Sequence, residues 1–151
     1  MARLDRAFAE EAAARLEALP ADAQPKWGSL TRDGVIAHLA GSFGYSMGQV
    51  AALPPQSGPP MRKLVSWLLI NGIIPFPKGV KFKGNDGQQI PALSSEGGIV
   101  HLREIMEEFI ALVDRGDQPP CGHPVFGEYT GEEWLKFHRA HLNHHLKQFG
   151  A

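Results

Sequence analysis

The segment TGEEWLKFHRAHLNHHLKQFG, residues 130–150, decides the fold because it is the most clearly delimited helix of the chain. Thr130 followed by Glu133 matches a capping box, in which the two residues bind the free N–H groups at the start of a helix. Gly150 follows the last apolar residue of the pattern, a position at which glycine commonly ends a helix. The sequence therefore predicts a helix from about residue 131 to residue 149.

Four of the seven histidines of the chain lie within this helix, at residues 138–145. On a helical wheel of about 100° per residue, His138, His141 and His145 share the buried face, and His144 lies on its flank. Buried imidazoles are costly unless their nitrogens find partners, and a metal ion is one such partner. Since His141 and His145 are four residues apart, their rings lie one turn apart on the same side, which suits two ligands of one zinc ion.

It is also open that these histidines bind no metal, because hydrogen bonds between helices can satisfy a buried imidazole. His138 is best interpreted as a packed core residue or as a residue that contacts a metal ligand but not the metal. His144 is best interpreted as a surface or loop contact. Sharper motifs are absent from the sequence. A zincin needs Glu where this chain has Leu142, and a di-iron bundle needs Glu-x-x-His on two helices.

Apolar residues recur at three- and four-residue steps elsewhere in the chain and predict further amphipathic helices. The long ones are expected at residues 3–19, 31–53 and 95–115, and a short one at residues 61–71. Thr31 is a suitable N-cap for the second of them. Together with the last helix, this pattern predicts an all-α protein, an antiparallel four-helix bundle with a short extra helix in the middle.

Two stretches between these helices lack any clear period. Residues 54–60, PPQSGPP, are predicted to form a loop, and residues 72–94 a long irregular connection that includes an extended piece. A connection of that length in a small protein is either functional or a sign that the elements are assigned wrongly. We find no repeat and no boundary, so residues 1–151 are interpreted as one domain.

Composition and charge narrow the range of partners and locations. The net charge is −1 and there is no basic run with interleaved aromatics, so no nucleic-acid partner is expected. The most apolar stretch, residues 64–76, is too short and too interrupted to span a membrane, and it is expected to cover the end of the bundle or to form a homodimer contact. Cys121 has no second cysteine to pair with, and residues 1–19 lack the apolar core of a signal peptide. We therefore expect a cytoplasmic protein.

Two motifs resemble a known family. The stretch WGSLTRDGVIAHL, residues 27–39, places a lone histidine in AHLA early in the second helix, and HPVFGEYTGEEWLKFHRAHLNHHLKQFG, residues 123–150, ends in a His-x-x-His-His cluster. In their order and in their placement on helices, these motifs resemble the DinB/YfiT-like metalloprotein superfamily. More specifically, they resemble its branch known as domain of unknown function 1569, and the resemblance extends over most of the chain.

The resemblance implies a metal triad of His38, His141 and His145, matched position by position. It also implies nickel or zinc as the metal, with water or a thiol substrate in the remaining coordination positions. Better-known relatives transfer low-molecular-weight thiols or use them as cofactors. The periodicity of residues 31–53 does not by itself bury His38, because the apolar face of that helix is centred about 120° away. His38 is therefore expected at a polar cleft between helices or at the surface.

Two further residues are candidates for a place near this site. Tyr45 lies near His38 on the wheel. It is either a proton donor, a residue that contacts a metal ligand but not the metal, or a packing residue. His123 precedes the last helix and either reaches the site or forms a structural turn.

Three functions remain open on the sequence. The first is a metal-dependent transferase or hydrolase acting on a thiol or other small molecule. The second is a protein with a structural or sensory metal, closed by His138 or His144 as a fourth ligand. The third is a homodimeric interaction module without metal, in which His38 lies far from the other two histidines.

Overall fold

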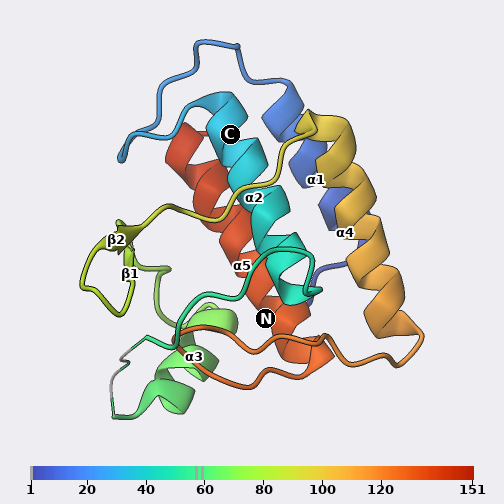
Figure 1. The fold of residues 1–151 in the computed structure, drawn as a ribbon. Coiled ribbons are helices and arrows are strands. Elements are labelled where there is room, and N and C mark those ends of the chain that lie inside the picture. The colour runs from blue at the N-terminus through green and yellow to red at the C-terminus, as the bar shows by residue number, and fades with distance from the viewer. Residues whose placement is uncertain (1, 57, 59) are drawn as a thin grey trace.

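The computed structural model describes residues 2–56, 58 and 60–151. This part of the chain is mostly helical, with five helices and one two-stranded hairpin (Figure 1). The elements are α1 (Arg6–Glu17), α2 (Arg32–Ser46), α3 (Arg62–Ile70), β1 (Phe82–Lys83), β2 (Gln89–Ile90), α4 (Gly98–Asp114) and α5 (Gly131–Phe149). The predicted all-α class is confirmed. Residues 57 and 59 of the predicted loop 54–60 lie outside the described residues.

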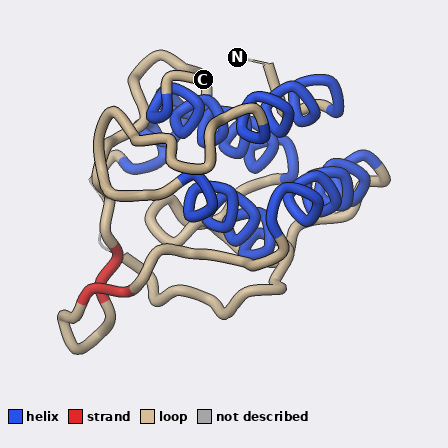
Figure 2. The backbone as a smooth tube through the Cα atoms, turned by 90° about the horizontal axis from the view of Figure 1, so that it is seen from above, coloured by secondary structure: helices blue, strands red, loops and turns tan. Residues whose placement is uncertain are grey.

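Side-chain contacts between the four longer helices give their relative directions. Ser46 at the end of α2 bonds to His138, whereas His38 nearer the start of α2 contacts His141 further along α5, so these two helices run in opposite directions. Arg103 near the start of α4 pairs with Glu17 at the end of α1, so these two are antiparallel as well. Figure 1 shows α2 and α4 running the same way, and Figure 2 shows the hairpin projecting from the side of the helices.

The predicted caps of α2 and α5 are confirmed. Thr130 accepts a hydrogen bond from the Glu133 backbone N–H at 3.1 Å, and the Glu133 carboxylate accepts one from the Thr130 backbone N–H at 2.8 Å. Gly150 ends α5 in the left-handed conformation, with φ of +68°. Thr31 caps α2 through the backbone N–H of Gly34 at 3.0 Å.

The predicted end of the second helix is wrong. Residues 31–53 were expected to be helical, but α2 ends at Ser46. Gly48 follows in the left-handed conformation, with φ of +73°, and such a glycine readily ends a helix. Val50 and Leu53 still pack against the core, although they belong to irregular chain. The ends of the other helices lie within three residues of the predicted ones.

The core lies between the four longer helices and extends to one face of α3. Leu69 and Ile70 of α3 are buried in it, while Leu64 and Trp67 on the other face are exposed. The largest fully buried side chains are Trp134, Phe43, Phe109, Leu4, Leu16, Leu39, Leu102, Ile105, Met106, Ile110, Leu135 and Leu142. None of the helices in the described part of the chain has the length and apolar character needed to cross a bilayer.

We call the connection between α3 and α4, residues 71–97, the crossover segment. It forms one wall of the histidine site described in the next subsection. It contains the predicted extended piece, since β1 and β2 pair antiparallel with Phe82 opposite Ile90. Beyond β2 the segment passes across α2 (Figure 1), where the Ser95 backbone N–H donates to the Ala37 carbonyl at 2.9 Å. The crossover segment is therefore anchored on the helix that carries His38.

Candidate metal centre

Three histidines from two helices converge on one point. The Nε2 atom of His141 is 3.1 Å from Nε2 of His38 and 3.0 Å from Nε2 of His145. His141 and His145 lie one turn apart on α5, whereas His38 comes from the neighbouring α2. One nitrogen of each ring lies within 4.8 Å of the others, so the three residues form a group that could hold a metal ion. We call this group the triad.

Two of the three rings are oriented by hydrogen bonds on the opposite nitrogen. Nδ1 of His38 is 2.9 Å from the carbonyl of Leu93, and Nδ1 of His145 is 2.7 Å from the side-chain oxygen of Gln148. Both oxygens can only accept, so each Nδ1 carries the proton and each Nε2 presents a lone pair. Gln148 is itself held by its side-chain N–H, which donates to the Trp27 carbonyl at 2.8 Å.

The third ring completes a donor set that fits a cation. The Nδ1 atom of His141 is buried and has no hydrogen-bond partner among the described residues. This Nδ1 is unpaired in either tautomer, so it does not decide where the proton lies. A proton on Nε2 would require one N–H to serve two acceptors. A proton on Nδ1 instead leaves three Nε2 lone pairs facing one another. A metal ion that takes neutral imidazole ligands would satisfy this second arrangement.

Burial keeps the triad in the neutral state that metal binding requires. It is the main cause that lowers the pKa of His38, and it lowers the pKa of His145 to about 3. The pKa of His141 falls well below its usual value for the same reason, and the two neighbouring imidazoles lower it further. At neutral pH all three rings are therefore uncharged and can offer their lone pairs.

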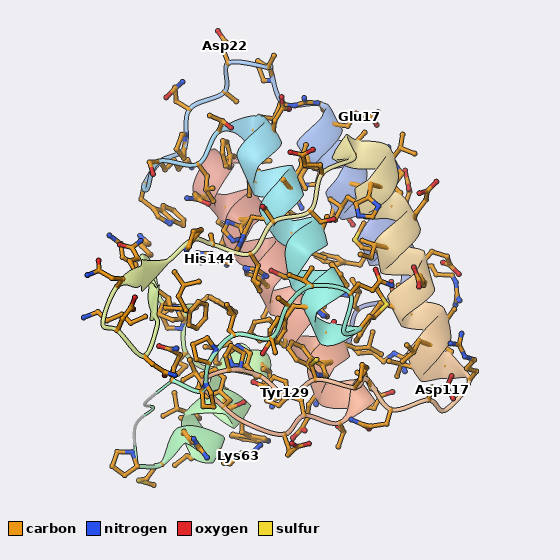
Figure 3. All side chains as sticks on the ribbon, in the orientation of Figure 1. Glu17, Asp22, Lys63, Asp117, Tyr129 and His144 are labelled. Carbon is orange, nitrogen blue, oxygen red and sulfur yellow. The ribbon has the colours of Figure 1, made fainter. Side chains whose placement is uncertain are left out.

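The other two histidines of the cluster lie outside the triad. His138 is 1% exposed, binds the Ser46 hydroxyl through Nε2 at 3.0 Å and stacks on Phe43 at 3.9 Å between ring centres, which is a core packing role. His144 is half-buried and packs against Trp27, with 5.5 Å between the two ring centres. Figure 3 shows His144 on the side of α5 that faces the crossover segment.

His123 forms a turn, and Tyr45 is a buried residue of α2. The Nδ1 atom of His123 accepts hydrogen bonds from the backbone N–H groups of Val125 and Phe126, at 3.1 and 3.2 Å, and burial lowers its pKa to about 3. Tyr45 is buried, and its burial raises the pKa of the phenol. Both residues line the cavity described next.

A cavity of about 440 Å³ opens beside the triad. His38, His141 and His145 lie in its wall together with His144, and no aspartate or glutamate is among the described residues that line it. The remaining wall is mostly aromatic and aliphatic, with side chains that include Trp27, Tyr45, Phe76, Val80, Phe82, Phe126, Trp134 and Phe137. The triad therefore faces a space in which a small molecule could bind, rather than being enclosed by protein on all sides.

Sequence reasoning missed the groups that orient the triad. Gln148 lies three residues after His145 on the same helix, so helical spacing could have indicated it. The carbonyl of Leu93 could not be found in this way, because it reaches His38 only through the path of the crossover segment.

We expect Gly41→Ala to destabilise the fold by about 1–3 kcal/mol and to weaken metal binding about 10–100-fold. A Cβ on Gly41 would lie 2.5 Å from the backbone nitrogen of Ser94, so the crossover segment must move and carry the Leu93 carbonyl away from His38. Urea unfolding and zinc titration measure the two effects.

The matched control is Gly44→Ala on the same helix, where the new Cβ would meet a side-chain methyl of Val50 at 3.0 Å instead of backbone. Its effects should be smaller because a side chain can give way. Equal effects of the two substitutions would show that the contact at Gly41 does not position the site.

The comparisons with known proteins bear on the C-terminal part of the chain. No curated protein and no solved structure matches the chain. A family model does match residues 87–151, a stretch that runs from the hairpin to the end of the chain and contains His141 and His145 but not His38. Over these residues the chain is similar to a family described as a protein of unknown function, DUF1569.

Proposed function

We propose that this protein binds a divalent metal, nickel or zinc, through His38, His141 and His145, and uses it in a transferase or hydrolase reaction on a small molecule, with a thiol as the favoured substrate. We also propose that its four longer helices form a DinB-like bundle in a single domain, in which α1 and α4, and likewise α2 and α5, run antiparallel. The observation that carries the metal site is the convergence of three Nε2 atoms, two of which belong to rings whose Nδ1 protons are bound elsewhere.

The surroundings of the triad favour catalysis over a structural metal. A closed structural site needs a fourth ligand, but His138 is hydrogen-bonded to Ser46 and neither His138 nor His144 belongs to the group. An interaction module without metal was expected to keep His38 far from the other histidines, and its Nε2 is 3.1 Å from that of His141. A cavity beside the triad suits a site with open coordination positions.

A cation held by three neutral imidazoles would keep its full charge and lower the pKa of a bound water or thiol, which makes a nucleophile near neutral pH. The chain supplies orientation and shielding. The Leu93 carbonyl and Gln148 hold two of the imidazoles, and the apolar wall keeps bulk water away. Tyr45, whose raised pKa keeps it protonated, is the candidate proton donor in the wall. A reducing, cytoplasmic location suits the single cysteine.

Metal content measured by mass spectrometry on protein purified without a histidine tag tests the proposal. Wild-type protein should carry nickel or zinc in near-stoichiometric amount, and His145→Ala should lower the affinity by at least about 100-fold, because two imidazoles bind a divalent ion far more weakly than three. His144→Ala is the matched control, since this adjacent histidine lies outside the triad, and it should keep the metal. Wild-type protein that stays metal-free after incubation with zinc and nickel would refute the proposal.

A further inference from the structure

We propose that the cavity beside the triad binds a small molecule with an apolar body and one anionic head group, oriented so that the head group faces the three histidines. The inference deepens the proposed function and depends on it only for the anchoring of the head group. The chemistry of the cavity wall carries it in two independent ways, through its apolar surface and through the sign of its charge.

Apolar rings in the wall extend up to the triad itself. Phe76 of the crossover segment stacks on His141 with 5.4 Å between ring centres and 21° between ring planes, and Phe137 approaches the same ring at 5.6 Å. Val80 and Phe82 continue this surface on the crossover segment, and both line the cavity. A molecule lying along this wall buries apolar surface, whereas a polar body would lose its hydration without gaining partners.

The polar side chains next to the triad are already hydrogen-bonded within the protein. The Ser42 hydroxyl donates to the His38 carbonyl at 3.0 Å. Gln148 uses its oxygen for His145 and its N–H for the Trp27 carbonyl. Because these side chains already use their hydrogen-bonding atoms within the protein, they favour a ligand whose body makes few hydrogen bonds of its own.

Charge in the wall favours an anion over a cation. No carboxylate lies among the described residues that line the cavity, whereas Lys81 does line it. At the rim, the ammonium of Lys78 lies 4.1 Å from the centre of the Trp27 ring, and Trp27 is itself part of the wall. The fixed charge around the opening is therefore positive, so a negative head group is attracted and an ammonium group is repelled.

Calorimetric titration with three simple probes tests both properties. The probes are 3-phenylpropanoate, its cationic counterpart 3-phenylpropylamine, and acetate, which has the head group without the body. In metal-free and zinc-loaded protein alike, 3-phenylpropanoate should bind at least tenfold more tightly than either of the other two. Zinc should tighten its binding further, because the head group faces the triad. Equal affinities for the three probes, or no effect of zinc in protein that metal analysis shows to carry it, would overturn the inference.

A matched pair of substitutions locates the binding. Val80 is 52% exposed and lines the cavity, while Val100 on α4 is 62% exposed and does not line it, so both positions should tolerate glutamate. Val80→Glu should weaken 3-phenylpropanoate at least tenfold without loss of metal, and Val100→Glu should leave both unchanged. Equal behaviour of the two variants would place the probe outside this cavity and overturn the inference.

The failure of this inference differs from that of the proposed metal site. A protein that carries zinc but does not discriminate between the probes would keep the metal site and lose the ligand class. A protein that binds no metal but still prefers 3-phenylpropanoate, and loses it in Val80→Glu, would keep the ligand class and lose the metal site.

Discussion

Trp134→Ala is expected to lower the free energy of unfolding by about 3–5 kcal/mol, the cost typical of removing a fully buried tryptophan. Trp134 is 2% exposed, and its ring meets Tyr129 edge-to-face at 5.1 Å and stacks on His138 at 5.2 Å. Its indole N–H donates to the Cys121 carbonyl at 2.9 Å, which ties the loop before α5 to the helix. Urea unfolding followed by circular dichroism measures the loss.

Trp134→Phe separates the ring from the hydrogen bond. Phenylalanine keeps most of the apolar surface but leaves the Cys121 carbonyl without its donor, so this variant should lose only about 1–2 kcal/mol. Both variants should retain zinc in the folded state, because Trp134 does not belong to the triad. If the alanine variant proved no less stable than the phenylalanine variant, the aromatic packing around Trp134 would contribute little to the fold.

Stability should fall by several kcal/mol between pH 7 and pH 5 in metal-free protein, with about 2 kcal/mol of the loss due to His138 alone. Burial lowers the pKa of His138 to about 3, whereas in the unfolded chain it lies near the ordinary value of 6.5. Below about pH 6.5 the unfolded chain therefore binds a proton that the folded protein excludes, and acid favours unfolding. His123, whose pKa is also lowered to about 3, adds a loss in the same direction.

His138→Gln tests the assignment of this pH dependence. Glutamine does not titrate and can still bond to the Ser46 hydroxyl, so the variant should be less sensitive to pH by about 2 kcal/mol between pH 7 and pH 5. Unfolding curves in urea at pH 7, 6 and 5, with a chelator present, separate this effect from metal binding. A wild-type stability that does not change over this range would contradict a neutral, buried His138.

The last helix could be predicted from the sequence almost completely because its signals are local. The capping box at Thr130 and Glu133, the glycine at its end and the four-residue spacing of His141 and His145 all act within one or two turns of the chain. The same local rules place the ends of most other helices. They failed at the end of α2, where Val50 and Leu53 keep a helical spacing although Gly48 has already turned the chain.

Sequence by itself thus determined the helical class, the limits of α5 and the pair His141 and His145. It could not place His38, which lies at the edge of its own apolar stripe, and only the resemblance to a family singled that residue out. Tertiary structure decided that His38 meets the pair, because α2 packs against α5. The crossover segment on α2 then brings the Leu93 carbonyl to the His38 ring. Tertiary structure also decided the cavity. Its walls come from segments far apart in the chain, and only their packing against one another determines which side chains line it.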